Sequence, residues 1–376
     1  MSNVMPARLG SRPRALLALV ACAAVFSAFA RPADELAFRP AAGAKAAKKC
    51  AIEIELAVRD FALRINGEPA PKKTAEGLGE LSALLHLDAQ VTDTYVKSAG
   101  GRPLELTRAY ETLRLRGETG DRSRTETDLD TFVGETVRFV WDEEKQAYAK
   151  SLVEVEATRV DVDATRVGLD ATRVGLDATR VGAEAKDEAL AGLSEDMDAR
   201  GLLPARPVAV GDTWKVSGDA LAALFVPGGL FGLDARGGAD AEMRAFLGQL
   251  ARGARGLTVE CTYTGAREEA GRTLAKIAFT FDGDTAFDVL GLAQSIAPDV
   301  SEAAHGLAVE AQLHLDGKGA LEWDVAAGRA HALAFESALE LRVDVRAEIE
   351  QEGRPKFALD AHVVAGGKGS WELAVK

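Results

Sequence analysis

The strongest constraint on the fold lies near the C-terminus, where apolar and charged residues alternate over the 17 positions from Leu333 to Ile349. Every odd position in this stretch except Ser337 is apolar, and six of the eight even positions are charged. A period of two places alternate side chains on opposite faces of a β-strand, whereas a helix would spread the charges around its circumference. The stretch therefore predicts one strand of an antiparallel sheet that has a buried face and a solvated face.

A strand of this length has to bend. At about 3.3 Å per residue it would span about 56 Å, which is longer than most strands of globular proteins. We expect the bend near Ser337, which is followed by the small Ala338. A long bent strand favours a large curved antiparallel sheet or a half-open barrel.

Alternating patterns predict strands through the rest of the chain as well. Apolar residues alternate from Ile52 to Val58 and then change phase before Phe61, which predicts a β-bulge near Arg59 and Asp60. The other strand candidates are Val91 to Val96, Leu104 to Leu115, Thr136 to Val140, Leu257 to Tyr263, Leu274 to Phe281, Leu307 to Leu315, Gly319 to Val325 and Phe357 to Val375. The glycines of Asp316–Gly319 predict a hairpin turn, and those of Gly366–Gly369 predict a break in the last strand.

Helical signals are fewer. Apolar residues at helical spacing predict helices over Ala75–Leu87, Lys186–Asp198 and Ala239–Arg252, and we expect the last two to pack on the sheet. The fold class is therefore mainly β (α+β), a large curved antiparallel sheet or half-open barrel with two or three packed helices.

The first 30 residues have the pattern of a secretory signal. Basic residues precede an apolar run from Ala15 to Phe29, and the run ends in a small-x-small cleavage pattern at Ala28–Ala30. Leu-Val-Ala-Cys, ending at Cys22, resembles the bacterial lipobox, so lipidation of Cys22 stands as an alternative to simple cleavage. Both alternatives predict an exported protein, either periplasmic or extracellular, or anchored to a membrane as a lipoprotein.

Composition divides the remaining chain. Residues 31–49 predict a linker, because they are rich in Ala and Pro and hold a small basic cluster that includes Lys48. Residues 50–156 and 187–376 are then the two parts of one β-rich domain, separated by a heptad-repeat insertion over 157–186. Four near-identical heptads fill 157–184. They predict a solvated insertion, and a helical arm is the alternative. Three of the heptads contain a glycine, and each glycine disfavours a helix by about 1 kcal/mol.

Charge and cysteine content limit the partners and the chemistry. The net charge is −13, so the chain will not bind nucleic acid through bulk electrostatics. Cys50 and Cys261 both fall in phase with apolar strand positions. An exported protein could join them in a disulfide, and two separately buried thiols are the alternative.

Catalytic signals are missing from the sequence. No two of the five histidines have a zinc-type spacing, and the chain has no nucleophile elbow, phosphate loop or dinucleotide fingerprint. We therefore expect no enzyme activity, no cofactor and no metal site. The charged face of Leu333–Ile349 is expected to be solvated surface with cross-strand charge pairs.

One segment carries a resemblance to known proteins. Leu202–Trp214 reads LLPARPVAVGDTW, and it follows an aromatic-rich strand candidate, Val137–Trp141. This pattern, with Gly319–Asp324 near the C-terminus, resembles uncharacterised secreted bacterial β-rich proteins that are similar in architecture to LolA/LppX-type proteins. The resemblance implies a strongly curved antiparallel sheet half-closed over helices, and it carries over no catalytic residue.

Two functions fit these observations. The first is a non-catalytic carrier that binds an apolar, lipid-like ligand in the concave face of the sheet. The second is a structural or protein-interaction module of the cell envelope with a fully packed core, whose partners would be envelope proteins. Core packing is the expected role of Trp214, Trp323 and Trp371. If a ligand is bound, the candidate binding residues on the concave face are Trp323, Phe335, Leu339, Leu341 and Val343. No oligomeric state is indicated.

Overall fold

The computed structural model describes residues 33–70, 82–119, 123–128, 132–153, 189–229, 239–289, 308–349 and 357–376. The predicted signal segment with Cys22, and the heptad repeat, lie outside these residues. The described chain forms an antiparallel sheet of 13 strands in the order β7-β6-β4-β3-β1-β13-β12-β11-β10-β9-β8, with β2 paired to β1 and β5 paired to β4. The predicted mainly β fold with few helices is confirmed.

Most of the described elements are strands, and the helices lie between β7 and β9 in chain order. The strands are β1 (Ala44–Ile65), β2 (Glu68–Pro69), β3 (Ser82–Ala99), β4 (Arg102–Thr119), β5 (Ser123–Asp128), β6 (Thr136–Asp142), β7 (Ala147–Leu152), β8 (Thr213–Ser217), β9 (Thr258–Glu269), β10 (Arg272–Ala286), β11 (Ala308–Asp324), β12 (Arg329–Ile349) and β13 (Phe357–Val375). Among the described residues, the helices with defined bounds are a 3₁₀ turn, η1 (Arg200–Leu202), and the α-helices α4 (Gly218–Phe225) and α5 (Ala239–Ala254).

Strand β12 confirms the alternating pattern. It pairs with β11 on one side and β13 on the other, and its odd-numbered residues from Leu333 to Leu339 are buried while Ala334, Glu336 and Ala338 are exposed. The pairing passes Ser337 without a change of register. The bend expected there stays a prediction.

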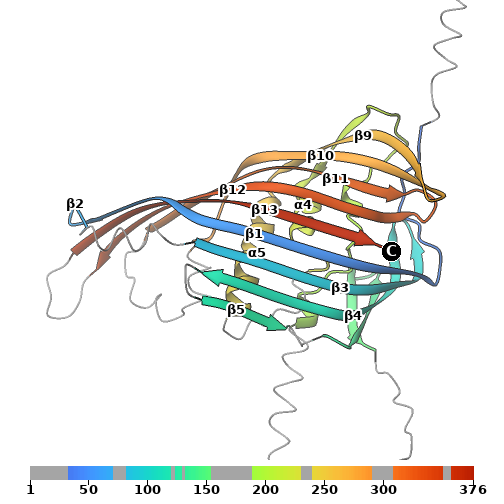
Figure 1. The fold of residues 1–376 in the computed structure, drawn as a ribbon, viewed down its shortest axis with the longest axis horizontal. Coiled ribbons are helices and arrows are strands. Elements are labelled where there is room, and N and C mark those ends of the chain that lie inside the picture. The colour runs from blue at the N-terminus through green and yellow to red at the C-terminus, as the bar shows by residue number, and fades with distance from the viewer. Residues whose placement is uncertain are drawn as a thin grey trace, which may run out of the picture.

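The first long strand and the last one are neighbours in the middle of the sheet. β1 pairs with β13 along almost its full length, from Lys48 opposite Val375 to Ile65 opposite Leu359. The register shifts between Val58 and Asp60, which confirms the predicted bulge. Figure 1 shows β1 and β13 side by side at the centre of the sheet, with both helices behind it.

Both glycine-based interruptions are wrong, because β11 runs unbroken through Gly317 and Gly319 and β13 runs unbroken through Gly366–Gly369. Aromatic rings from the inner face occupy the space that side chains would take. A Cβ on Gly317 would lie 2.2 Å from the Phe281 ring, and a Cβ on Gly369 would lie 2.3 Å from the Trp371 ring. These glycines therefore make room for rings within a strand and form no turn.

Two of the three predicted helices are wrong where they are described. Helix α5 confirms Ala239–Arg252, but residues 82–87 of the predicted Ala75–Leu87 helix belong to β3. There Leu85 and Leu87 alternate with solvent-facing residues as part of a longer period-two pattern. Of the described residues 189–198 of the predicted Lys186–Asp198 helix, 189–191 are helical and 192–198 are not. Helix α4 was not predicted.

The predicted linker is also wrong in its second half. β1 begins at Ala44, and the preceding Leu36 and Phe38 are buried in the core. The composition of 31–49 resembles a linker because Ala46 and Lys48, the inward-facing residues, are a small residue and a charged one. Lys48 is 2% exposed, so its charge lies inside the protein.

Segment 202–214 crosses from η1 to β8. It leaves η1 in an extended conformation, turns at Gly211 and Asp212, and enters β8 at Thr213. The Asp212 carboxylate accepts a hydrogen bond from the Ala209 amide at 3.0 Å, and the Trp214 indole donates one to the Leu202 carbonyl at 3.0 Å. These two bonds close the turn and hold it against the core.

The helices cover part of the inner face of the sheet. Phe225, the last residue of α4, lies among Phe281, Phe335 and Trp371, with ring centroids 6.1, 5.7 and 4.8 Å from its own. The Trp371 indole donates a 3.3 Å hydrogen bond to the Phe225 carbonyl. Figure 1 shows that β1, β12 and β13 continue beyond α5, so the helices lie behind only part of their length.

The two described cysteines are separately buried free thiols. Cys50 faces the core from β1 and Cys261 from β9. Burial, with smaller effects of Asp88 on Cys50 and Glu260 on Cys261, raises the pKa of each thiol from 9.0 to about 12. Both groups are therefore neutral thiols at physiological pH, and the thiolate is the reactive form.

We predict that substituting a glycine under an aromatic ring destabilises the sheet. In Gly319→Ala, the new Cβ would lie 2.3 Å from the Phe335 Cβ and 2.6 Å from the Phe279 ring, so we expect a loss of about 1–3 kcal/mol in the free energy of unfolding. Urea denaturation measures it. The matched control is Gly117→Ala in β4, where a Cβ meets nothing within 4 Å and stability should be kept. Equal stabilities of the two variants would contradict the packing argument.

We also predict that both buried thiols are unreactive in the folded protein. In a Cys22→Ser background at pH 8, a chromogenic disulfide reagent should modify neither Cys50 nor Cys261 until denaturant unfolds the chain, because both are buried and protonated. After unfolding, two thiols per chain should react. Rapid modification of either one without denaturant would show that its strand opens.

Candidate functional site

The five predicted binding residues divide into two groups. Trp323 is fully buried, with its ring centroid 6.5 Å from that of Phe38, and Phe335 stacks on Trp371 with centroids 4.5 Å apart and planes 2° apart. Leu339 is buried in the same core cluster. Core packing is thus confirmed for Trp323 and Trp371. The other two predicted residues, Leu341 and Val343, lie farther along β12, where this cluster ends.

Beyond Leu341 the inner face of the sheet stays apolar. Its side chains come from four adjacent strands and none belongs to the core cluster of the described residues. We call this surface the distal inner face; it comprises Val58, Phe61, Leu63, Val309, Val343, Val345, Ala347, Leu359, Ala361, Val363 and Ala365. Val343, Ala347 and Ala361 are buried and the others are half-buried.

Strand register aligns these residues in rows across the sheet. Phe61 lies opposite Val363, which lies opposite Val343, and the next row joins Leu63 and Ala361 in the same way. Side chains directly opposite each other in an antiparallel pair lie on the same face. The bulge after Val58 adds one residue to β1. Inward-facing positions therefore change from even to odd numbers, and Phe61 and Leu63 lie on this face.

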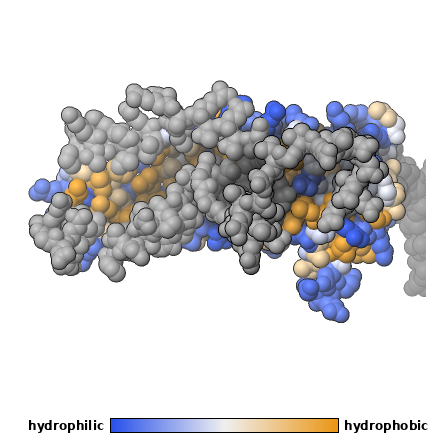
Figure 2. Space-filling view, turned by 90° about the horizontal axis from the view of Figure 1, so that it is seen from below, coloured by the Kyte–Doolittle hydropathy of each residue, from blue (hydrophilic) through white to orange (hydrophobic). Residues whose placement is uncertain are grey.

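Small aliphatic side chains dominate the distal inner face, and Phe61 is its one aromatic residue. Its rows extend over about 20 Å along the strands and about 14 Å across them, taking usual strand spacings. In Figure 2 an apolar band lines the end of the molecule at which β1, β12 and β13 project, on the left as in Figure 1. The arrangement can bind an elongated apolar group, and it offers no charged side chain to a polar one.

The outer face of the same strands is polar, as predicted. Glu340 accepts two hydrogen bonds from Arg342, its neighbour along β12, at 2.9 and 2.5 Å. Across the strands, His362 and Asp344 lie 2.8 Å apart. These groups are partly or mostly exposed, so each pair contributes little to stability and keeps the face solvated.

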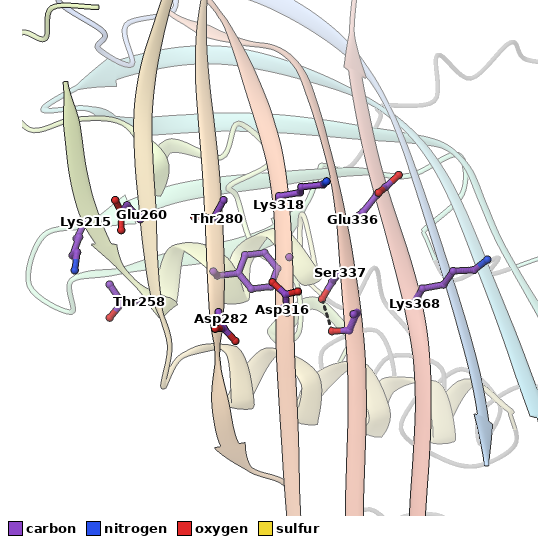
Figure 3. A pocket seen from close by; sticks show the side chains of 13 residues that line it. Lys215, Thr258, Glu260, Thr280, Asp282, Asp316, Lys318, Glu336, Ser337 and Lys368 are labelled. Atoms are coloured by element: carbon purple, nitrogen blue, oxygen red, sulfur yellow. Dashed lines mark hydrogen bonds between the residues drawn. The ribbon is translucent and has the colours of Figure 1, made fainter. Parts of the chain in front are cut away.

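A depression of about 610 Å³ lies on the outer face over β8 to β13. Figure 3 shows its charged side chains projecting from the sheet, away from the helix behind it. Opposite charges face each other across strands, with Lys215 beside Glu260 and Lys318 beside Glu336. Such alternation matches a solvated surface. Among the described residues, no group of three or more His, Cys, Asp or Glu could hold a metal ion.

A second concentration of charge is buried. Lys48 of β1, Asp93 and Tyr95 of β3, Arg108 of β4 and Asp198 form what we call the buried ionic cluster. The Lys48 Nζ lies 2.8 Å from Asp93 Oδ2 and 3.0 Å from Asp198 Oδ1. Arg108 donates to both oxygens of Asp93, at 2.6 and 3.0 Å, and the Tyr95 hydroxyl donates to Asp198 Oδ2 at 2.6 Å.

The cluster balances two cations against two carboxylates. Burial alone would raise the pKa of Asp93, but the charges of Arg108 and Lys48 and their hydrogen bonds lower it below its ordinary value. Burial, together with the nearby charges of Asp198 and Asp93, raises the pKa of Tyr95 well above its usual range. Asp93 is therefore ionised and Tyr95 is a neutral hydrogen-bond donor at physiological pH.

The same cluster explains why residues 192–198 are not helical. Arg108 donates to the carbonyls of Ser194 and Glu195, at 2.8 and 2.9 Å, and Lys150 donates to the carbonyl of Leu193. Carbonyls that would accept hydrogen bonds within a helix are thus bonded to side chains of the sheet. The cluster fixes this segment across the ends of β3 and β4.

The buried ionic cluster was not predicted, although the sequence holds a signal for it. Lys48 falls in phase with the apolar residues that follow it on β1, and Asp93 and Arg108 fall in phase with those of β3 and β4. One charged residue at an inward position of a single strand has no clear meaning. Charged residues of both signs at inward positions of three strands predict a buried network of ion pairs.

No helix in the described part of the chain is both long and apolar enough to cross a membrane. No family model matches the chain, and no curated protein matches it. The chain is similar to a solved structure described as lipid-protein interactions in lipovitellin, at 9% identity and a TM-score of 0.31; the match covers 90% of this chain and 25% of that one. It is also similar to the outer membrane protein OprG from Pseudomonas aeruginosa, at 7% identity and a TM-score of 0.16, over 88% of this chain and 97% of that one. Neither carries an argument about function.

We predict that breaking the buried ionic cluster is costly. Arg108→Met removes the cation that holds Asp93 at both oxygens and leaves excess negative charge inside the protein, so we expect a loss of about 3–5 kcal/mol in the free energy of unfolding. The control is Arg138→Met, which removes an exposed ion pair with Glu105 and should cost about 1 kcal/mol or less. Chemical denaturation compares them. Similar losses would show that Arg108 contributes no more than a surface charge.

Proposed function

We propose that this protein is a non-catalytic binder of an apolar, lipid-like ligand, and that the ligand lies on the distal inner face. The observation that carries the proposal is the register of aliphatic residues across β1, β13, β12 and β11 beyond the end of the core cluster. Eight of the eleven side chains of this face are only half-buried, so they keep apolar surface that an apolar ligand could cover.

The composition of this face favours an alkyl chain over a bulky ring system. Val, Ala and Leu side chains form most of the distal inner face, whereas the part of the sheet near α4 is filled by Phe225, Phe335 and Trp371. The distal inner face is about 20 Å long, comparable to an extended fatty-acyl chain. Transfer of each methylene of such a chain from water would contribute about 0.8 kcal/mol.

Export belongs to the same proposal. The N-terminal pattern before Arg31, with Cys22 as an alternative lipidation site, supports a periplasmic, extracellular or membrane-anchored location. The resemblance of Leu202–Trp214 to secreted β-rich proteins of LolA/LppX-type architecture supports it too. An exported acyl-chain binder needs no catalytic group, in keeping with a site built of aliphatic residues.

A second candidate is a structural or interaction module of the cell envelope. It is favoured by the packing near α4, where Trp371, Phe335 and Phe225 fill the inner face completely. The two candidates differ in what the distal inner face contacts, a lipid or protein.

The test is a charge placed in the middle of the distal inner face. Val363 lies at the centre of the distal inner face, between Phe61 and Val343. The substitution Val363→Glu should weaken binding of a fluorescent fatty acid at least tenfold. Native mass spectrometry of the wild-type protein, purified gently from its own envelope and followed by lipid extraction, should show a bound lipid that the variant lacks.

The matched control is Val364→Glu, one residue along β13, on the outer face between Asp60 and Arg342. It introduces the same charge into the same strand, so fatty-acid binding should be retained. Thermal unfolding of both variants separates loss of binding from loss of folding. Equal fatty-acid affinity of the two folded variants, or no lipid and no fatty-acid binding by the wild type, would overturn the proposal and favour the interaction module.

A further inference from the structure

We propose that Lys48 and Asp198 condense to form an intramolecular isopeptide bond, which joins β1 covalently to the segment that precedes η1. The reacting groups are a primary amine and a carboxyl group inside the buried ionic cluster. Nothing in the proposed lipid binding depends on this bond, so the two proposals stand or fall separately.

The reacting groups are already in contact. Lys48 Nζ lies 3.0 Å from Asp198 Oδ1, and both side chains are almost completely excluded from solvent. Both atoms are buried, and the Lys48 ammonium has carboxylate oxygens of Asp93 and Asp198 within 3.0 Å. The two atoms that the reaction would consume are therefore held against each other out of contact with water.

Two neighbours supply the remaining chemistry. Asp93 Oδ2 lies 2.8 Å from Lys48 Nζ and can accept its proton as a base, while Arg108 keeps Asp93 ionised by donating to both of its oxygens. The Tyr95 hydroxyl donates to Asp198 Oδ2 at 2.6 Å, where negative charge develops as the amine adds to the carboxyl carbon. Asp93, held by Arg108, is the base, and Asp198 is the electrophile.

The reaction balances without any further reactant. Lys48 Nζ bonds to Asp198 Cγ, and the bond between Cγ and Oδ1 breaks. Of the three protons of the ammonium group, one stays on the amide nitrogen and two leave with Oδ1 as water, one of them carried by Asp93. One positive and one negative charge disappear together, so the product is neutral and nothing is oxidised or reduced.

Folding provides the driving force. Groups held in contact in a folded protein react as if at effective concentrations of about 10⁵–10⁸ M, and the site excludes the bulk water that would favour hydrolysis. After condensation the cluster contains Arg108 and Asp93 alone as charges, in a cross-strand pair joined by two hydrogen bonds. The product therefore leaves no unpaired charge in the core.

Intact mass spectrometry of the purified protein, with its N-terminus identified, tests the bond directly. We expect a mass lower by one water than the sequence requires. Tryptic digestion should yield a branched peptide that contains Lys48, uncleaved after that residue, linked to Asp198. Lys48→Met should restore the full mass, whereas Lys49→Met, at the neighbouring exposed position, should keep the loss of one water.

Every outcome is decisive. The full sequence mass in the wild-type protein overturns the proposal without reference to any variant or to its folding. A water loss located in an unbranched peptide, as from a succinimide, overturns it too, and a branch to Asp93 overturns the assignment of Asp198. Asp93→Asn separates the roles further: a folded variant that still forms the bond would show that Asp93 is not the base.

Discussion

The structure depends on one requirement, that the apolar face of a one-sided sheet be removed from water. Charged residues alternate with apolar ones along β12, so the strand has only one face that can bury itself. Helix α4 meets that requirement at the middle of the sheet by placing Phe225 against the stacked rings of Phe335 and Trp371. Farther along the strands the same apolar pattern continues beyond the core cluster, and this mismatch between strand length and helical cover creates the candidate site.

The buried ionic cluster meets the same requirement by other means. A segment with Ser194, Glu195 and Asp198 is too polar to cover a sheet through apolar contacts alone. It covers β3 and β4 because Arg108 and Lys48 satisfy its carbonyl and carboxylate oxygens. Buried charges add little net stability compared with apolar packing, but they require a unique partner and so define where the segment lies.

Much of the fold, and little of the site, could be predicted from the sequence. Period-two alternation located β12 and the bulge in β1, because both patterns are local. Gly317 and Gly369 predict interruptions that do not occur, because the rings of Phe281 and Trp371 occupy the space beside these glycines within unbroken strands. Lys48 was misread as part of a linker, because its partners, Asp93 and Asp198, are distant in sequence. Trp323 and Phe335 were correctly assigned to the inner face, but their burial depends on helices and loops that the strand pattern does not describe.

The pairing of β1 with β13 has a consequence for how the chain reaches this structure. These strands form the seam between two halves of the sheet, one running from β1 to β7 and the other from β13 to β8. The seam contains residues from both ends of the described chain, so it cannot form while the last strand is still being synthesised. Until β13 has been synthesised each half exposes an unpaired central edge, and any chain that stops short of β13 leaves two half-sheets with no strand to join them.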